Sequence, residues 1–223
     1  MVEIAERVGR YRRAAQNAQE AGFDGVELHG GNGYLIDQFL QDGSNQRTDE
    51  YGGEISNRMR FPLQVVDALI EVWGAGRVGV RISPALALNG MHDSDPKSLF
   101  TSFATALSDR KILYIHLVEP QNDDHRMYQG RTPLRHLEGI RASFSGLLMI
   151  NGGFSQDSAE AYLRDQKADL ISFGEPFIAN PDLPYRFKHH VSLSKGDPTS
   201  YYGGTERGYT DYPTHQEIQG ERP

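Results

Sequence analysis

Five short apolar segments, separated by stretches of helical periodicity, constrain the fold of this chain more than any other feature of its sequence. Each segment is rich in Val, Ile and Leu and is apolar on both faces, which is typical of strands in a parallel sheet covered by helices. The segments lie at residues 25–29, 78–82, 113–118, 147–150 and 169–173. The sequence therefore predicts an α/β protein built from consecutive βα units.

The stretches between these strands predict the helices. The first helix ends at Gly22, and the second begins near Ser56, whose hydroxyl suits an N-cap. Pro62 falls inside the second helical pattern, so it should lie in the first turns or kink the helix. Further helices are expected over residues 95–108, 133–143 and 155–164, and ending at the His189–His190 pair.

Composition limits the classes of function that are open to the chain. Its 223 residues include 30 Asp and Glu against 23 Lys and Arg, a net charge of −7 that argues against nucleic acid as the main partner. The absence of cysteine excludes disulfides, thiolate nucleophiles and iron–sulfur clusters. Because no apolar run is long enough to span a membrane and no leader opens the chain, we expect a soluble, cytoplasmic protein.

Polar residues and glycines follow the predicted strands at the point where each strand ends. In a parallel βα barrel, these strand ends and the loops after them form the active site. The residues are His29 and Asn32, Arg81 and Ser83, His116 and Glu119, Asn151 with Gly152 and Gly153, and Gly174 with Glu175. We expect them to share one site. His116, Glu119 and His125 match no zinc pattern, so no metal site is expected.

The loop His-Gly-Gly-Asn-Gly-Tyr at residues 29–34 gives the sharpest chemical signal. His29 and Asn32 can both donate a hydrogen bond to one carbonyl oxygen and stabilise negative charge that develops there. Tyr34 offers a phenol as proton donor. The alternative is an ordinary turn in which His29 caps a helix and Tyr34 packs, but the surrounding glycines favour the close approach of a flat ligand.

Glycine turns follow the last two predicted strands. In barrels, the loops after the last two strands often bind phosphate through backbone N–H groups. Gly152, Gly153 and Gly174 stand in these two turns. Simple turns that need glycine only for its backbone conformation are the alternative.

Five ordered motifs over nearly the whole chain resemble the old yellow enzyme family. The motifs are HGGNGYLIDQFL at 29–40 with SNQRTDEYGG at 44–53, VGVRISP at 78–84, GGF at 152–154, FIANPDL at 177–183, and YYGG at 201–204 with GYTDYP at 208–213. Members of this family are FMN-dependent, NADPH-using ene-reductases on a TIM barrel, among them the plant oxophytodienoate reductases.

The resemblance implies roles for the substrate-side residues. His29 and Asn32 would bind the carbonyl of an α,β-unsaturated substrate, and Tyr34 would protonate its α-carbon after a hydride from reduced FMN has gone to the β-carbon. Tyr202 would line the substrate side of the pocket.

The resemblance also implies a cofactor site, with one departure. Arg81 would lie against the pyrimidine edge of the flavin, and Gly152, Gly153 and Gly174 would bring N–H groups to the FMN phosphate. Glu175 stands where the family has an arginine for that phosphate. FMN binding is therefore expected to be weakened or lost, unless Glu175 turns into solvent and other donors hold the phosphate.

The number of strands is the second departure. An eight-stranded barrel takes about 250 residues, and the resemblance begins at the helix before the family's fourth strand. Residues 1–190 are thus expected to form a partial βα barrel with about five of eight strands, corresponding to family strands four to eight. Residues 191–223 are expected to form a C-terminal tail that packs near the site. The two free sheet edges predict an oligomer or a partner chain that completes the barrel.

Three functions stay open at this stage. The leading one is flavin-dependent reduction of activated C=C bonds with NADPH. The second is a flavin-independent isomerase or cyclase that uses His29, Asn32 and Tyr34 as an acid–base set. The third is a truncated, non-catalytic homologue that pairs through its sheet edges.

Overall fold

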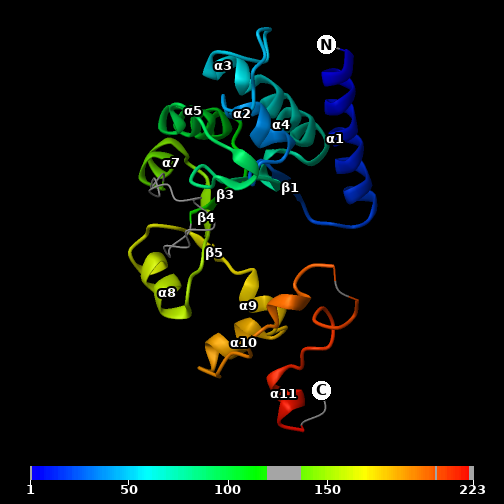
Figure 1. Cartoon of the computed structure of the whole chain (residues 1–223), viewed down its shortest axis with the longest axis vertical. Helices are drawn as coiled ribbons and strands as arrows, with labels where there is room; N and C mark the ends of the chain where they lie inside the picture. Colours follow the sequence, from blue (N-terminus) through cyan, green and yellow to red (C-terminus); the bar gives the residue numbers. More distant parts are fainter. Residues whose placement is uncertain (1, 120–136, 204, 221–223) are drawn as a thin grey trace.

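The computed structural model describes residues 2–119, 137–203 and 205–220, and its centre is one parallel sheet (Figure 1). The strands are β1 (Val26–His29), β2 (Val78–Ile82), β3 (Tyr114–Val118), β4 (Leu147–Asn151) and β5 (Leu170–Ser172). They are hydrogen-bonded in the order β1-β2-β3-β4-β5, each parallel to the next. All five predicted strands are confirmed, and their bounds differ from the prediction by at most one residue at each end.

Helices follow the strands in the βα alternation that the sequence predicts. The longer helices are α1 (Val2–Glu20), α4 (Arg60–Trp73), α5 (Pro96–Asp109), α7 (Leu137–Ser143) and α8 (Gln156–Arg164). Of the predicted helix over 133–143, residues 133–136 lie outside the described residues. The helices near the C-terminus, α9 (Glu175–Ile178), α10 (Leu183–Lys188) and α11 (His215–Ile218), form a group away from α4 and α5 (Figure 1).

Short elements complete the described chain. They are α2 (Leu35–Leu40), α3 (Ile55–Arg58) and three single turns of 3-10 helix at Ala75–Arg77, Leu88–Gly90 and Pro198–Ser200. Helix α10 ends at Lys188 with His189 as its C-cap, so the predicted helix end at the histidine pair is confirmed. No helix in the described ranges is both long and apolar enough to cross a membrane.

The predicted N-cap at Ser56 is wrong. Ser56 lies inside α3, and α4 begins at Arg60 after Met59, whose helical backbone carries the chain from one helix into the next without a side-chain cap. Pro62 is the third residue of α4, where its missing N–H falls in the first turn and breaks no hydrogen bond of the helix interior.

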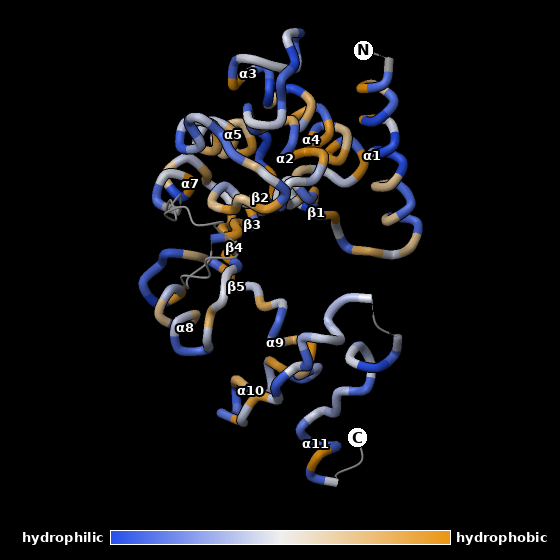
Figure 2. The backbone as a smooth tube through the Cα atoms, in the orientation of Figure 1, coloured by the Kyte–Doolittle hydropathy of each residue, from blue (hydrophilic) through white to orange (hydrophobic). Residues whose placement is uncertain are grey.

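The core lies on one face of the sheet, between the strands and the helices that cover them. Val80, Ile115 and Leu148 are register neighbours on β2, β3 and β4, and all three are fully buried. Phe61 of α4 and Phe103 of α5 are buried in the same cluster. Figure 2 shows the apolar stretches gathered where α4 meets these strands.

The other face of the sheet is open. Side chains alternate between the two faces along a strand, so the register places Glu27, His29, Arg81 and His116 on the face opposite the core. Apolar residues of β4 and β5 also stay uncovered in the described structure, with Leu147 and Leu170 each 41% exposed. Among the described residues, β1 and β5 each have only one neighbouring strand, so the sheet keeps two free edges and does not close.

Candidate active site

A polar network spans the open face of the sheet from β1 to β5. The Arg81 guanidinium lies 2.6 Å from His116 Nε2 and donates to Asn151 Oδ1 at 3.2 Å. His116 Nδ1 lies 3.0 Å from Glu27 Oε2. An arginine side chain can only donate hydrogen bonds, so His116 Nε2 is the acceptor. The proton of the ring is then on Nδ1, which donates a hydrogen bond to the Glu27 carboxylate. Ser172 Oγ lies 2.7 Å from the same Nε2 atom, which ties β5 into the network.

The network controls the charges on this face. Burial would raise the pKa of Glu27, but the hydrogen bond from His116, helped by the hydrogen bond from Tyr114 and the charge of Arg81, outweighs it and lowers that pKa. Burial lowers the pKa of Arg81, against the attraction of Glu27. Burial and the positive charge of Arg81 lower the pKa of His29. The open face therefore holds a carboxylate beside a guanidinium, with a neutral His29 at its rim.

The loop after β1 brings His29, Asn32 and Tyr34 together. The Gly30 N–H donates to the Arg81 carbonyl at 2.7 Å and continues the sheet into the loop. The rings of His29 and Tyr34 are 5.3 Å apart at an interplanar angle of 52°. Tyr34 is 58% exposed, so its hydroxyl is open to a ligand.

Asn32 is the strained residue of this loop. Its φ is 58°, the left-handed conformation that side chains other than glycine rarely adopt. Its backbone is tied at both ends, since its N–H donates to Ser83 Oγ at 2.6 Å and its carbonyl accepts from Asn89 Nδ2 at 2.9 Å. The side-chain atom Oδ1 is buried and has no hydrogen-bond partner among the described residues. The backbone of Asn32 is thus held by hydrogen bonds on both sides, while the oxygen of its carboxamide has no hydrogen-bond partner among the described residues.

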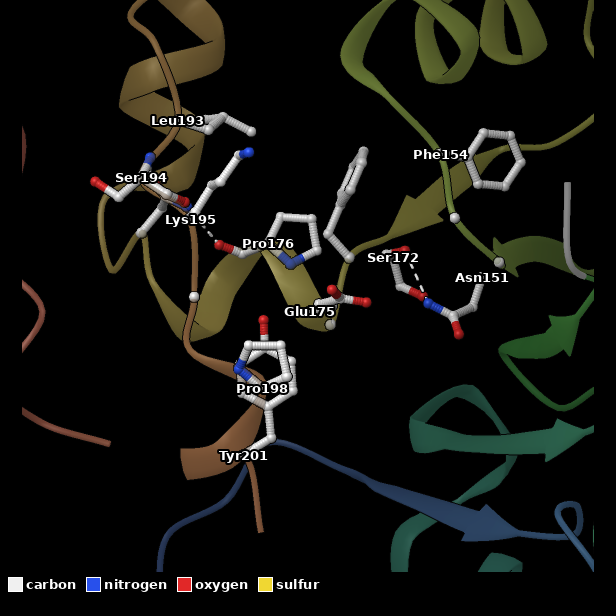
Figure 3. A pocket seen from close by; sticks show the side chains of 16 residues that line it. Asn151, Phe154, Ser172, Glu175, Pro176, Leu193, Ser194, Lys195, Pro198 and Tyr201 are labelled. Carbon is white, nitrogen blue, oxygen red and sulfur yellow. Dashed lines mark hydrogen bonds between the residues drawn. The ribbon is translucent and has the colours of Figure 1, made fainter. Parts of the chain in front are cut away.

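A cavity of about 640 Å³ lies at the ends of β4 and β5 (Figure 3). The strand-end residues that line it are Asn151, Gly152, Gly153, Ser172, Gly174 and Glu175. Gly152 and Gly153 have φ values of 151° and 76°, a backbone path that favours glycine. The structure therefore brings together the glycine turns that the sequence places after the last two strands.

The C-terminal tail lines the other side of this cavity with residues for which the sequence predicted no individual role. They are Leu193, Ser194, Lys195, Gly196, Pro198 and Tyr201. Tyr202, which the resemblance places on the substrate side, is 91% exposed and does not line the cavity. Its neighbour Tyr201, which directly follows a single turn of 3-10 helix over 198–200, lines the cavity instead.

Glu175 and Lys195 are the charged residues that line the cavity, and they are not paired. No ion pair joins them among the described residues, and in Figure 3 the Glu175 carboxylate points toward Asn151 and Ser172 while the Lys195 ammonium lies beyond Pro176. Burial and the Glu175 carboxylate raise the pKa of Tyr201, so its phenol stays protonated.

One residue of the expected polar set takes another position. Ser83 is fully buried beneath the loop after β1, where it supports Asn32 instead of facing a ligand. His125 lies outside the described residues, and the part of the chain that is described holds no group of three or more His, Asp or Glu side chains arranged to bind a metal.

Together, these observations define a class of protein. A parallel sheet with helices on one face, and polar groups gathered where its strands end, is part of a βα barrel with its site at the end where such barrels carry their active sites. The chain belongs to the NADH:flavin oxidoreductase / NADH oxidase family, whose model matches residues 1–194. Old yellow enzymes are among its structural relatives, so the resemblance is confirmed.

Three relatives illustrate the match. The 12-oxophytodienoate reductase 1 of Oryza sativa subsp. japonica is 42% identical over 222 residues, which are 98% of this chain and 58% of the relative. Morphinone reductase superposes with a TM-score of 0.90 at 45% identity, covering 96% of this chain and 57% of that one. The old yellow enzyme homologue from Zymomonas mobilis gives 0.91 at 40% identity, with 96% and 59% covered. The chain spans little more than half the length of these relatives, which confirms the predicted partial barrel.

The family implies a flavin, and the site's own residues fit a flavin nucleotide. The open face offers a charged Arg81 held by its neighbours, and the cavity at β4 and β5 offers glycine backbone for a phosphate. Lys195 and Ser194 add donors from the tail. Glu175 is the lining group that opposes a phosphate dianion.

Proposed function

We propose that this chain carries the carbonyl-binding and proton-donating part of a flavin-dependent ene-reductase, which reduces the C=C bond of an α,β-unsaturated carbonyl compound. The observation that carries the proposal is the loop after β1, where His29, Asn32 and Tyr34 stand on one fixed turn beside the Arg81 network. Membership of a flavin oxidoreductase family and relatives named as reductases support it.

His29 and Asn32 would bind the substrate carbonyl. The lowered pKa of His29 keeps its ring neutral at neutral pH, and a neutral ring still offers one N–H donor. The Asn32 carboxamide supplies the second donor from a backbone that is tied at both ends. Two donors that converge on one oxygen stabilise the negative charge that appears there when the β-carbon accepts a hydride.

Tyr34 would give the proton that completes the reduction. Its ring lies next to His29, so its hydroxyl can reach the α-carbon of a substrate whose carbonyl is held by His29 and Asn32. A phenol is a weak enough acid to stay protonated until the substrate carries negative charge.

Arg81 and the glycine turns would hold the cofactor. When bound, reduced FMN supplies the hydride, with NADPH as the source of electrons. Arg81 would face the pyrimidine edge of the flavin, where a fixed cation favours the anionic reduced form. Gly152, Gly153 and Gly174 would give N–H groups to the phosphate, while Glu175 opposes it. Tyr202 stays a prediction for the substrate side.

A further polypeptide would complete the barrel. The free edges of β1 and β5 and the uncovered Leu147 and Leu170 support this proposal, because a closed barrel has no edge strands and buries such residues. We infer that three more βα units, on a partner chain or in an oligomer, would cover this face.

The substitution Tyr34→Phe tests the proposed reaction. In the presence of FMN, reduction of the flavin by NADPH should keep its rate, whereas reoxidation of the flavin by cyclohexenone should slow at least 100-fold, within the range of general acid catalysis. Both steps are followed by the visible absorbance of the flavin. A reoxidation rate equal to that of the parent chain would remove Tyr34 from the mechanism.

Two alternatives have an observation in their favour. The carboxylate of Glu175 in the phosphate cavity favours a flavin-independent isomerase or cyclase that uses His29, Asn32 and Tyr34. Conversion of an enone without NADPH, abolished in Tyr34→Phe, would establish it. The free sheet edges favour a non-catalytic assembly module, which light scattering from a purely monomeric sample would exclude.

A further inference from the structure

A buried carboxylate lies beneath the loop that carries Asn32 and Tyr34. Asp37, the third residue of α2 (Figure 1), is completely buried, and no Lys, Arg or His side chain pairs with it in the described structure. A buried charge without a cation is costly, and one that persists beside a ligand site suggests a use there. Asp37 is not one of the proposed carbonyl-binding donors, and it does not line the cavity at β4 and β5.

In the described structure, the hydrogen bonds that the Asp37 carboxylate accepts come from the loop and from its own helix. Oδ2 accepts the backbone N–H of Gly33 at 2.9 Å, and Oδ1 accepts Gln41 Nε2 at 2.8 Å. The side chain of Ser83 lies close enough to the carboxylate to lower its pKa. Because Ser83 Oγ in turn accepts the N–H of Asn32, the N–H groups of two consecutive loop residues both lead to Asp37, one directly and one through Ser83.

We call the Asp37 carboxylate, with its direct contact to Gly33 and its indirect contact to Asn32 through Ser83, the clamp. It acts on the part of the loop whose backbone conformation is least favourable. Asn32 and Gly33 have φ values of 58° and 76°, so two successive residues are left-handed. The loop is also pressed closely against its supports. A Cβ atom added to Gly31 would lie 2.7 Å from Ser83 Oγ, and one added to Gly33 would lie 2.7 Å from Asn89 Cβ. A tight turn of this kind needs acceptors for the N–H groups that it turns inward.

We propose that Asp37 is a positioning residue, whose carboxylate fixes the left-handed turn at Asn32 and Gly33 and thereby the direction of the Asn32 carboxamide and the Tyr34 phenol. The inference rests on the proposed function only for the roles of Asn32 and Tyr34. The clamp itself is a property of the chain and is measured without flavin or substrate.

The protonation state of Asp37 gives a way to observe the clamp. Burial raises the pKa of Asp37 to about 6, against the hydrogen bonds from Gln41 and Gly33 and the nearby Ser83 side chain, which lower it. The groups that face it are neutral: the backbone of the turn, Gln41 at the end of α2, and Ser83 after β2. A protonated carboxyl has lost part of its acceptor capacity, so the N–H of Gly33 should respond as Asp37 takes up its proton.

The test uses nuclear magnetic resonance on the whole chain. In the parent protein, the amide shift of Gly33 should follow the titration of the Asp37 carboxyl carbon with the same midpoint. In Asp37→Asn, hydrogen exchange at Gly33 should accelerate ten- to a hundredfold, the range for loss of a hydrogen bond to a charged group. Ser83→Ala should accelerate exchange at Asn32 more than at Gly33, because it removes only the indirect arm.

Asp67→Asn is the matched control, since Asp67 is a surface carboxylate that pairs with Arg110 and does not touch the loop. It should leave exchange at Gly33 and Asn32 unchanged. A Gly33 amide that ignores the titration of Asp37 overturns the inference even if Asp37→Asn does not fold. Exchange within twofold of the parent value in Asp37→Asn overturns it as well. Failure of enone reduction with an intact clamp would count against the proposed function alone.

Discussion

Replacing Glu175 by arginine should strengthen FMN binding and leave riboflavin binding nearly unchanged. Glu175 lines the cavity at the ends of β4 and β5, next to the glycine turns proposed for the phosphate, and it has no cationic partner among the described residues. Riboflavin lacks the phosphate but keeps the ring and the ribityl chain. The ratio of the two affinities therefore isolates the phosphate contact from every other contact of the flavin.

The magnitude follows from the exposure of the site. Two unit charges about 4 Å apart interact by about 1 kcal/mol in water and by about 4 kcal/mol near a protein surface. Glu175 is exposed, so screening by solvent favours the lower value. Removing the repulsion and adding one attraction of that size gives about 2 kcal/mol, or about 30-fold in the dissociation constant of FMN.

Titration calorimetry with FMN and with riboflavin measures this ratio. Glu175→Gln is the control that removes only the repulsion, and it should give about half of the gain, or about fivefold. The gain should shrink as salt is added, because salt screens exposed charges. If Glu175→Arg changes the FMN and riboflavin affinities by the same factor, Glu175 does not face the phosphate and the reasoning fails.

Two further changes test how the loops around the site are held. Arg58→Met should lower the free energy of unfolding, measured by urea denaturation, by about 3–5 kcal/mol. The reason is that Arg58 and Asp93 form a buried ion pair at 2.5 Å, whose loss leaves the Asp93 carboxylate uncompensated. A loss below about 1 kcal/mol, the scale of a surface pair, would contradict this. The contribution of Asp37 to the stability of the parent chain should fall by about 3 kcal/mol as pH rises from about 4 to 6, since folded Asp37 with its pKa raised to about 6 keeps a proton that the unfolded chain releases, and this contribution should level off above that window. Asp37→Asn should remove this contribution, and a pH profile identical to that of the parent chain would refute the assignment.

The strands could be predicted because each is encoded locally. Runs of Val, Ile and Leu buried on both faces specify a parallel strand whatever the rest of the chain does. The start of α4 could not be predicted in the same way. Ser56 has the chemistry of an N-cap, but buried Arg58 binds the carbonyls of Leu40 and Gly53 and draws residues 55–58 into a separate turn. That tertiary contact outweighs the local preference.

The site residues that follow a single strand could be predicted from the sequence. Those that join the site through the packing of several strands could not. The loop at 29–34 could be recognised as a candidate site from its composition alone, since it combines a histidine, an asparagine and a tyrosine with three glycines. Glu27 and Ser172 join the network only because the register places them on the same face of the sheet as His116, with Glu27 level with Tyr114 and Ser172 level with Val118. The spacing of Glu27 two residues before His29, on the same face of one strand, was the available signal. Lys195 and Tyr201 reach the cavity through the path of the tail, which no local pattern specifies.

The position of deuterium in the reduced product tests the central claim most directly. The chain is supplied with FMN, NADPH and cyclohexenone in heavy water, and the product is examined by mass spectrometry and nuclear magnetic resonance. Proton delivery by Tyr34 predicts one deuterium at the α-carbon, because the phenol exchanges with solvent, and none at the β-carbon, which receives its hydride from NADPH through the flavin. Deuterium at the β-carbon, or a product formed equally well without NADPH, would contradict the proposed ene-reductase.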